Sequence, residues 1–146
     1  MTELRTSETK LEFPYSRTLG PVAGAFMEAL REGRLLGIRG KDGRVLVPPL
    51  EYDPVTGESL GVEMVPVGPG GTVKAWAWVD EPSAKHPLDR PFAFALVQPD
   101  GADTTMVHAV DAGSIEKMST GMKVTARFRT EPTGLITDLE AWEPSR

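Results

Sequence analysis

Hydrophobic residues follow two different periods along this chain, and the first of them predicts a helix. Val22, Phe26 and Leu30 recur every four residues, which is the spacing of one helix face. Pro21 suits the first position of a helix and Gly33 suits the position just after its end. We therefore predict an amphipathic helix that begins at Pro21 and ends before Gly33, packed on its own domain or on a partner.

A short β-hairpin follows the predicted helix. Residues 35–38 and 45–47 are rich in leucine, isoleucine and valine, and the Asp-Gly pair at 42–43 is a favoured hairpin turn. Pro48 and Pro49 end the second strand because proline has no N–H group to donate to a sheet.

Beyond residue 64 the period changes to the alternation of β-strands. The five predicted strands cover residues 72–79, 92–97, 105–110, 123–129 and 135–142, with a short helical segment at 114–118 between the third and the fourth. This order is typical of a Greek-key barrel of the OB type. In the first strand, alternation places Val73, Ala75, Ala77 and Val79 on one face and Lys74, Trp76 and Trp78 on the other.

The predicted fold is therefore mainly β, a five-stranded OB-fold barrel preceded by a helix and a hairpin module. Residues 1–19 form an N-terminal arm without periodicity, residues 20–63 the helix and hairpin module, and residues 64–146 the OB-fold domain. The arm carries three apolar anchors that a free tail would not need: Leu11, Phe13 and Tyr15.

Composition narrows the function classes. The net charge of −5 opposes binding to nucleic acid or to anionic membranes. The absence of cysteine excludes disulfides and thiolate catalysis. No apolar run is long enough to span a bilayer, and the first residues are polar with both charge signs, so we expect a cytoplasmic protein.

Two tight turns in the hairpin module have the layout of a zinc ribbon. They are Gly40-Lys41-Asp42-Gly43 and Asp53-Pro54-Val55-Thr56-Gly57, on either side of an apolar strand and a Pro-Pro pair. In a zinc ribbon each turn offers two thiolates to one tetrahedral metal ion, whereas this chain has no cysteine. We therefore predict a metal-free ribbon. Its turns are closed by Gly40, Asp42, Gly43, Asp53, Thr56 and Gly57, with Asp53 accepting hydrogen bonds from backbone N–H groups across its turn.

A ribbon without zinc lacks the folding energy that the metal would contribute. A lone hairpin is marginally stable, so the module must bury apolar surface on the barrel, on the helix or on another protein. The residues available for this burial are Leu36, Ile38, Val45, Val47, Leu50 and Tyr52.

The order of these features resembles a family of acyl-CoA-associated proteins, domain of unknown function thirty-five, which join a rubredoxin-like zinc ribbon to an OB-fold. The segments that carry the resemblance are 26–35, 43–49, 70–73 and 121–124. The chain departs from the family at both metal-binding turns. Because members sit beside thiolase-fold proteins, the resemblance implies a non-catalytic subunit that binds a lipid-transfer-type thiolase-like protein as a hetero-oligomer. It also implies an acyl-CoA retro-aldolase or thiolase complex of steroid or lipid side-chain degradation, with acyl-CoA possible at the interface.

The residues themselves show no catalytic motif, and they indicate no cofactor and no metal. Candidates for partner or ligand contact are Tyr15, Phe26, Met27, Leu30, Pro48, Pro49, Tyr52, Trp76, Trp78, His86 and His108. A second hypothesis is a free-standing OB-fold module that binds acyl-CoA or single-stranded nucleic acid, because aromatic rings on an OB face can stack on bases. A third, an independent hydrolase or lyase, has no motif behind it.

Overall fold

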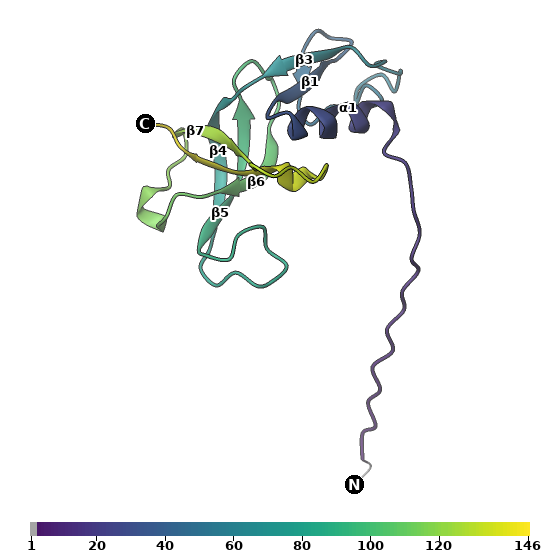
Figure 1. The fold of residues 1–146 in the computed structure, drawn as a ribbon, viewed down its shortest axis with the longest axis vertical. Coiled ribbons are helices and arrows are strands. Elements are labelled where there is room, and N and C mark those ends of the chain that lie inside the picture. Colours follow the sequence, from purple (N-terminus) through teal and green to yellow (C-terminus); the bar gives the residue numbers. More distant parts are fainter. Residues whose placement is uncertain (1–2) are drawn as a thin grey trace.

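A computed structural model describes residues 3–146, and Figure 1 shows a helix, two sheets and an extended arm that runs away from them. Residues 1–2 of the predicted arm lie outside the described part. In chain order the elements are α1 (Gly20–Arg31), β1 (Leu35–Arg39), β2 (Val45–Leu46), β3 (Met64–Val67), β4 (Gly70–Val79), β5 (Phe92–Pro99), β6 (Met106–Val110), the 3-10 helix η1 (Ile115–Lys117), β7 (Lys123–Phe128), the 3-10 helix η2 (Ile136–Asp138) and β8 (Leu139–Pro144).

Helix α1 matches its predicted period. Val22, Phe26 and Leu30 are buried on one face, as the four-residue spacing requires. Gly33 ends the helix with a φ of 72°, a conformation that is costly for residues with a side chain. The amide of Arg34 then donates to the carbonyl of Ala29 and closes the last turn.

The predicted hairpin is part of a three-stranded sheet in the order β2-β1-β3. Ile38 of β1 pairs with Leu46 of β2 on one side and with Met64 of β3 on the other. The sequence pattern indicated strand character from residue 64 onward, but it could not indicate which neighbour β3 would pair with. That choice depends on how the chain folds back.

The five strands of the OB-fold barrel are confirmed. The barrel closes in the order β4-β5-β6-β8-β7, and η1 lies between β6 and β7 as predicted. The last strand starts later than expected, because residues 136–138 form η2 and only then does β8 begin. Asp138 accounts for this difference: its carboxylate accepts hydrogen bonds from the amides of Thr133 and Gly134 and holds a turn there.

A β-bulge in β4 reverses the predicted faces of its second half. The pairing of β4 with β5 shifts register between Val73 and Ala75. An extra residue in one strand turns the following side chains to the opposite face. Trp76 and Trp78 consequently pack against the same core as Val73, whereas Ala75 and Ala77 are exposed. Period-2 alternation predicts faces only where the ladder is regular.

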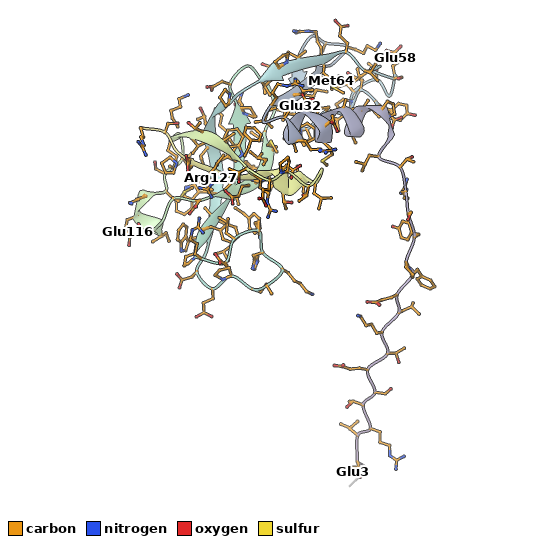
Figure 2. All side chains as sticks on the ribbon, in the orientation of Figure 1. Glu3, Glu32, Glu58, Met64, Glu116 and Arg127 are labelled. Carbon is orange, nitrogen blue, oxygen red and sulfur yellow. The ribbon has the colours of Figure 1, made fainter. Side chains whose placement is uncertain are left out.

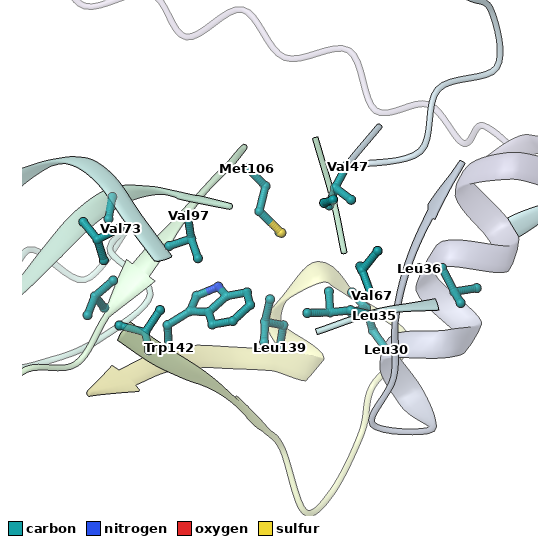
Figure 3. Packing of buried hydrophobic residues seen from close by; sticks show 14 of the residues in the cluster. Leu30, Leu35, Leu36, Val47, Val67, Val73, Val97, Met106, Leu139 and Trp142 are labelled. Atoms are coloured by element: carbon teal, nitrogen blue, oxygen red, sulfur yellow. The ribbon is translucent and has the colours of Figure 1, made fainter. Parts of the chain in front are cut away.

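One hydrophobic core runs through helix, ribbon and barrel. Figure 3 shows Leu30 and Leu35 in the same cluster as Leu139 and Trp142 of the barrel. Hydrogen bonds strengthen the junction, since the amide of Val45 donates to the Asp103 carboxylate at 2.8 Å. The amide of Val47 donates to the Thr104 hydroxyl at the same distance. The ribbon therefore packs on both the barrel and the helix.

Candidate functional site

Asp53 joins the two turns that would carry zinc ligands in a zinc ribbon. One carboxylate oxygen accepts a 2.9 Å hydrogen bond from the amide of Lys41 in the first turn. The other accepts 2.9 Å hydrogen bonds from the amides of Val55 and Thr56 in the second turn. The residue is 4% exposed. A single buried carboxylate thus connects both turns through backbone N–H groups.

The remaining predicted turn residues lie around this carboxylate. A Cβ atom at Gly40 would lie 3.1 Å from the Asp42 carboxylate and 3.2 Å from that of Asp53, a tight fit that favours glycine. Asp42 closes its own turn by accepting from the amide of Arg44 at 3.1 Å, and its carboxylate also pairs with the Arg44 side chain. In the second turn the amide of Gly57 donates to the carbonyl of Asp53.

The donor set at these turns does not suit zinc. Thiolates and imidazoles are absent here, and the oxygens of Asp53 are already occupied by three amides. Among residues 3–146, no group of three or more His, Asp or Glu side chains is placed to hold a metal ion. The ribbon turns therefore use an internal hydrogen-bond acceptor where a zinc ribbon uses a metal ion.

Hydrogen bonding also sets the charge state of Asp53. The amide of Lys41 contributes most, followed by that of Thr56, and together they lower the pKa of the carboxyl below its usual value. The carboxylate is therefore ionised at neutral pH. In that form it accepts all three N–H groups.

Two of the three helix residues predicted for partner contact are buried within the chain itself. Phe26 is 3% exposed and Leu30 is 1% exposed, and both belong to the chain's own core. Met27 is partly buried and packs against the same cluster. The four-residue period correctly found the apolar face of the helix, but a period cannot tell whether that face meets its own domain or another protein.

Other exposed apolar side chains lie on the 50–62 loop and at Leu19, just before the helix. Leu60 packs against the cluster that includes Val22 at the start of α1, which brings its part of the loop near the start of the helix. In Figure 2, Glu58 marks this loop beside the start of the helix. We call its exposed apolar residues the ribbon end: Leu19, Leu50, Tyr52, Val55 and Val62. Burial of Leu50 and Tyr52, expected from the sequence, is not observed.

The other predicted contact residues are distributed over three regions. Tyr15 lies on the arm and is 79% exposed. Pro48 is exposed and Pro49 half-buried, directly after β2. Trp76 and Trp78 lie half-buried against the barrel core, so their rings are not presented as a stacking platform for bases.

The two histidines lie on opposite faces of the barrel wall. His108 pairs with Ala95, whose side chain is buried, and burial lowers the pKa of this histidine. Its Nδ1 atom is buried without a hydrogen-bond partner. His86 accepts a 2.7 Å hydrogen bond from the amide of Ser83 and packs against the ring of Phe92 on the other face. The fold therefore does not combine them into one site.

A charge network on the barrel was not predicted from the sequence. Arg127, labelled in Figure 2, contacts Asp111 at 3.0 Å, Glu140 at 2.6 Å and Glu143 at 3.0 Å, and Arg90 also pairs with Asp111. Burial acts to raise the pKa of Asp111, but hydrogen bonds from the two arginines outweigh it and lower the pKa. The network ties the 80–91 loop to β7, to β8 and to the residue that follows β6. Its members are far apart in sequence, so no local pattern indicates it.

The outer face of the barrel holds one small apolar depression, of about 230 Å³. It lies over β4, β5 and β6, and its lining includes Ala75, Ala77, Leu96 and Val107. The bulge in β4 creates it by turning two alanines outward. Within the described residues, no helix is long and apolar enough to cross a membrane.

Comparison with known proteins supports the fold and the resemblance drawn from the sequence. Residues 64–129 match the family model described as the C-terminal OB-fold domain of ChsH2. A search of curated proteins gave no match. Among solved structures, the chain is similar to a chain of the Ltp2-ChsH2(DUF35) aldolase at 20% identity and a TM-score of 0.66, covering 88% of this chain and 98% of that one. A DUF35-family protein of unknown function from Sulfolobus solfataricus is similar at 17% identity and a TM-score of 0.58, covering 73% and 78% of the two chains.

The family model covers most of the barrel, whereas the structural match over 88% of the chain also takes in much of the helix and ribbon in front of it. The resemblance to the domain of unknown function thirty-five family is therefore confirmed: residues 64–129 match a ChsH2-type OB-fold, and the chain has no cysteine.

Proposed function

We propose that this protein is the non-catalytic accessory subunit of a thiolase-fold enzyme that acts on acyl-CoA substrates, as a retro-aldolase or a thiolase. The observation that carries the proposal is the likeness to a chain of the Ltp2-ChsH2(DUF35) aldolase, which covers 98% of that chain. We further propose that the complex is a hetero-oligomer acting in steroid or lipid side-chain degradation.

The use of the chain's polar groups supports a structural role. The buried carboxylates of Asp53 and Asp138 are occupied by backbone N–H groups, and Asp111 is paired with two arginines. His86 and His108 are on opposite faces of the barrel wall. In this arrangement the buried and ion-paired carboxylates hold the fold together. We therefore assign the acyl-CoA reaction to the partner.

The surface that supports docking is the ribbon end. Its apolar residues are exposed, four of them lie on the 50–62 loop, and they belong to a module anchored in the barrel core. Exposed apolar groups that gather on one surface are typical of interaction sites. In this proposal an acyl-CoA is held between this surface and the partner, so activity requires both proteins.

Co-expression with the thiolase-fold protein encoded nearest to this gene tests the proposal. The two proteins are expected to elute together in a fixed ratio, and cleavage or formation of the acyl-CoA carbon–carbon bond should require both. Val55→Asp should separate them because it places a charge in the apolar contact. Val107→Asp, at an exposed site on the barrel, is the matched control and should leave the complex intact. Full activity of the enzyme without this chain would contradict the proposal.

A further inference from the structure

The N-terminal arm is the largest apolar feature that the fold leaves unused. Residues 3–19 are exposed throughout and lead away from the helix in an extended course (Figure 1). Leu11, Phe13 and Tyr15 are 77%, 75% and 79% exposed. Side chains of this size each lose about 1.5–3 kcal/mol of burial free energy when left in water, so a chain that keeps three of them together gains from a surface that covers them.

The order of residues in the arm suits binding as an extended strand. Leu11, Phe13 and Tyr15 alternate with Glu12 and Pro14. In an extended chain this spacing puts the three apolar side chains on one side. Pro14 removes one backbone donor and disfavours a helix, so extended conformations are favoured in the segment before it binds. Anchors with a period of two are typical of peptides recognised along a groove or a strand edge.

The charges of the arm differ from those of the folded body. Three acidic residues (Glu3, Glu8, Glu12) balance three basic ones (Arg5, Lys10, Arg17), so the arm is neutral and the net charge of −5 belongs to the rest of the chain. Two copies of an acidic body repel each other, which disfavours an exchange of arms between copies. A neutral apolar segment needs an apolar groove and gains little from charge attraction.

The arm joins the folded body at the proposed docking surface. Leu19, the last residue before α1, is exposed and belongs to the ribbon end with Tyr52 and Val55. Fully extended, residues 3–19 span about 55 Å, so they can follow the surface of a partner well beyond that contact. A partner seated on the ribbon end is therefore within reach of the arm.

We infer that residues 11–19 bind in extended form along an apolar groove of the thiolase-fold partner, with Leu11, Phe13 and Tyr15 as anchors. This inference rests on the proposed function. The arm is then a second docking element beside the ribbon end. It orders on binding and adds affinity without changing the fold of either body.

The test compares both sides of the arm in the full-length chain. Leu11→Ser, Phe13→Ser and Tyr15→Ser are combined in one variant, and Lys10→Ser with Glu12→Ser, from the other side, form the control. Affinity for the co-expressed partner is measured by titration calorimetry. The triple variant should bind at least about a hundredfold more weakly and Phe13→Ser alone about tenfold, whereas the control should change affinity by less than about twofold. Because the arm lies outside the core, no variant should change the melting temperature.

Two further measurements distinguish the outcomes. Amide hydrogen exchange in residues 11–19 should slow in the complex, and raising the salt concentration should leave the contribution of the arm nearly unchanged. If the wild-type chain binds the partner and the triple variant binds equally well, the inference is overturned while the proposed function stands. If the isolated chain dimerises through the arm, a second copy is the occupant and the inference is overturned. If the wild-type chain does not bind the partner at all, both fail.

Discussion

The two sheets of this protein use apolar burial and polar contacts to different extents. In the barrel, strands close on one another and bury Trp142, Val97 and Val124 completely. In the ribbon module, strands β1 and β2 are buried, but the loop after them leaves Leu50 and Tyr52 exposed, and the turns are held by the hydrogen bonds of Asp53. Burial of apolar surface stabilises both sheets, and the ribbon turns depend in addition on a polar connection.

This difference shows what a metal-binding module needs in order to persist without its metal. The ribbon contributes Leu35, Val45 and Val47 to the barrel core, so its strands do not depend on zinc. Only the turns lack an apolar interior, and there an ionised carboxylate accepts three amides. Asp53 joins the two turns that a metal ion joins in a zinc ribbon. Packing on the barrel supplies the folding energy that the metal would contribute.

The largest expected effect is in the barrel. Trp142→Ala should lower the free energy of unfolding by about 3–5 kcal/mol, because it removes the largest fully buried side chain. Urea unfolding followed by circular dichroism measures the loss. Trp142→Phe should cost less, since it keeps an aromatic ring and removes an indole N–H that has no buried partner. Because the core is shared, the ribbon amides should lose protection together with the barrel. Ribbon amides that stay protected would show that the two sheets are independent.

A smaller effect is expected in the ribbon. Asp53→Ala should lower the melting temperature by several degrees, and exchange at the amides of Lys41, Val55 and Thr56 should become roughly tenfold faster or more, because these N–H groups lose their acceptor. Asp42→Ala is the matched control, since its exposed carboxylate closes only its own turn. Equal effects of the two substitutions would mean that Asp53 does not join the turns.

The smallest effects are expected from lowering the pH, which protonates Asp53, and from adding a metal chelator. The pKa of Asp53 is lowered in the folded state, so the stability it contributes is present above its unfolded pKa of about 4 and is lost as the pH falls through the folded pKa. In the wild type, hydrogen exchange at the amide of Lys41 should therefore become faster below about pH 4, after correction for intrinsic rates. In Asp53→Ala this acceleration by acid should be smaller. A chelator at neutral pH should leave the melting temperature unchanged. A fall in melting temperature with the chelator would indicate a metal in the ribbon.

Much of the fold follows from local patterns in the sequence. The four-residue spacing from Val22 to Leu30 predicts α1, and alternation together with turn residues predicts the five barrel strands and the short helix before β7. The role of Asp53 at its own turn also follows, because aspartate closes turns of this kind. Its bond to Lys41 does not follow, since that amide is in a different turn of the chain.

The sequence by itself determined the types of element, their order, the lack of thiolate ligands for zinc and the spacing of apolar residues in the arm, because each depends on neighbours along the chain. Only the tertiary structure decided that β3 joins the ribbon and that a bulge turns Trp76 and Trp78 toward the core. It also decided that Phe26 and Leu30 are buried in the chain's own core. These outcomes depend on which surfaces meet after the chain folds back. A period identifies an apolar face, but packing alone decides what covers it.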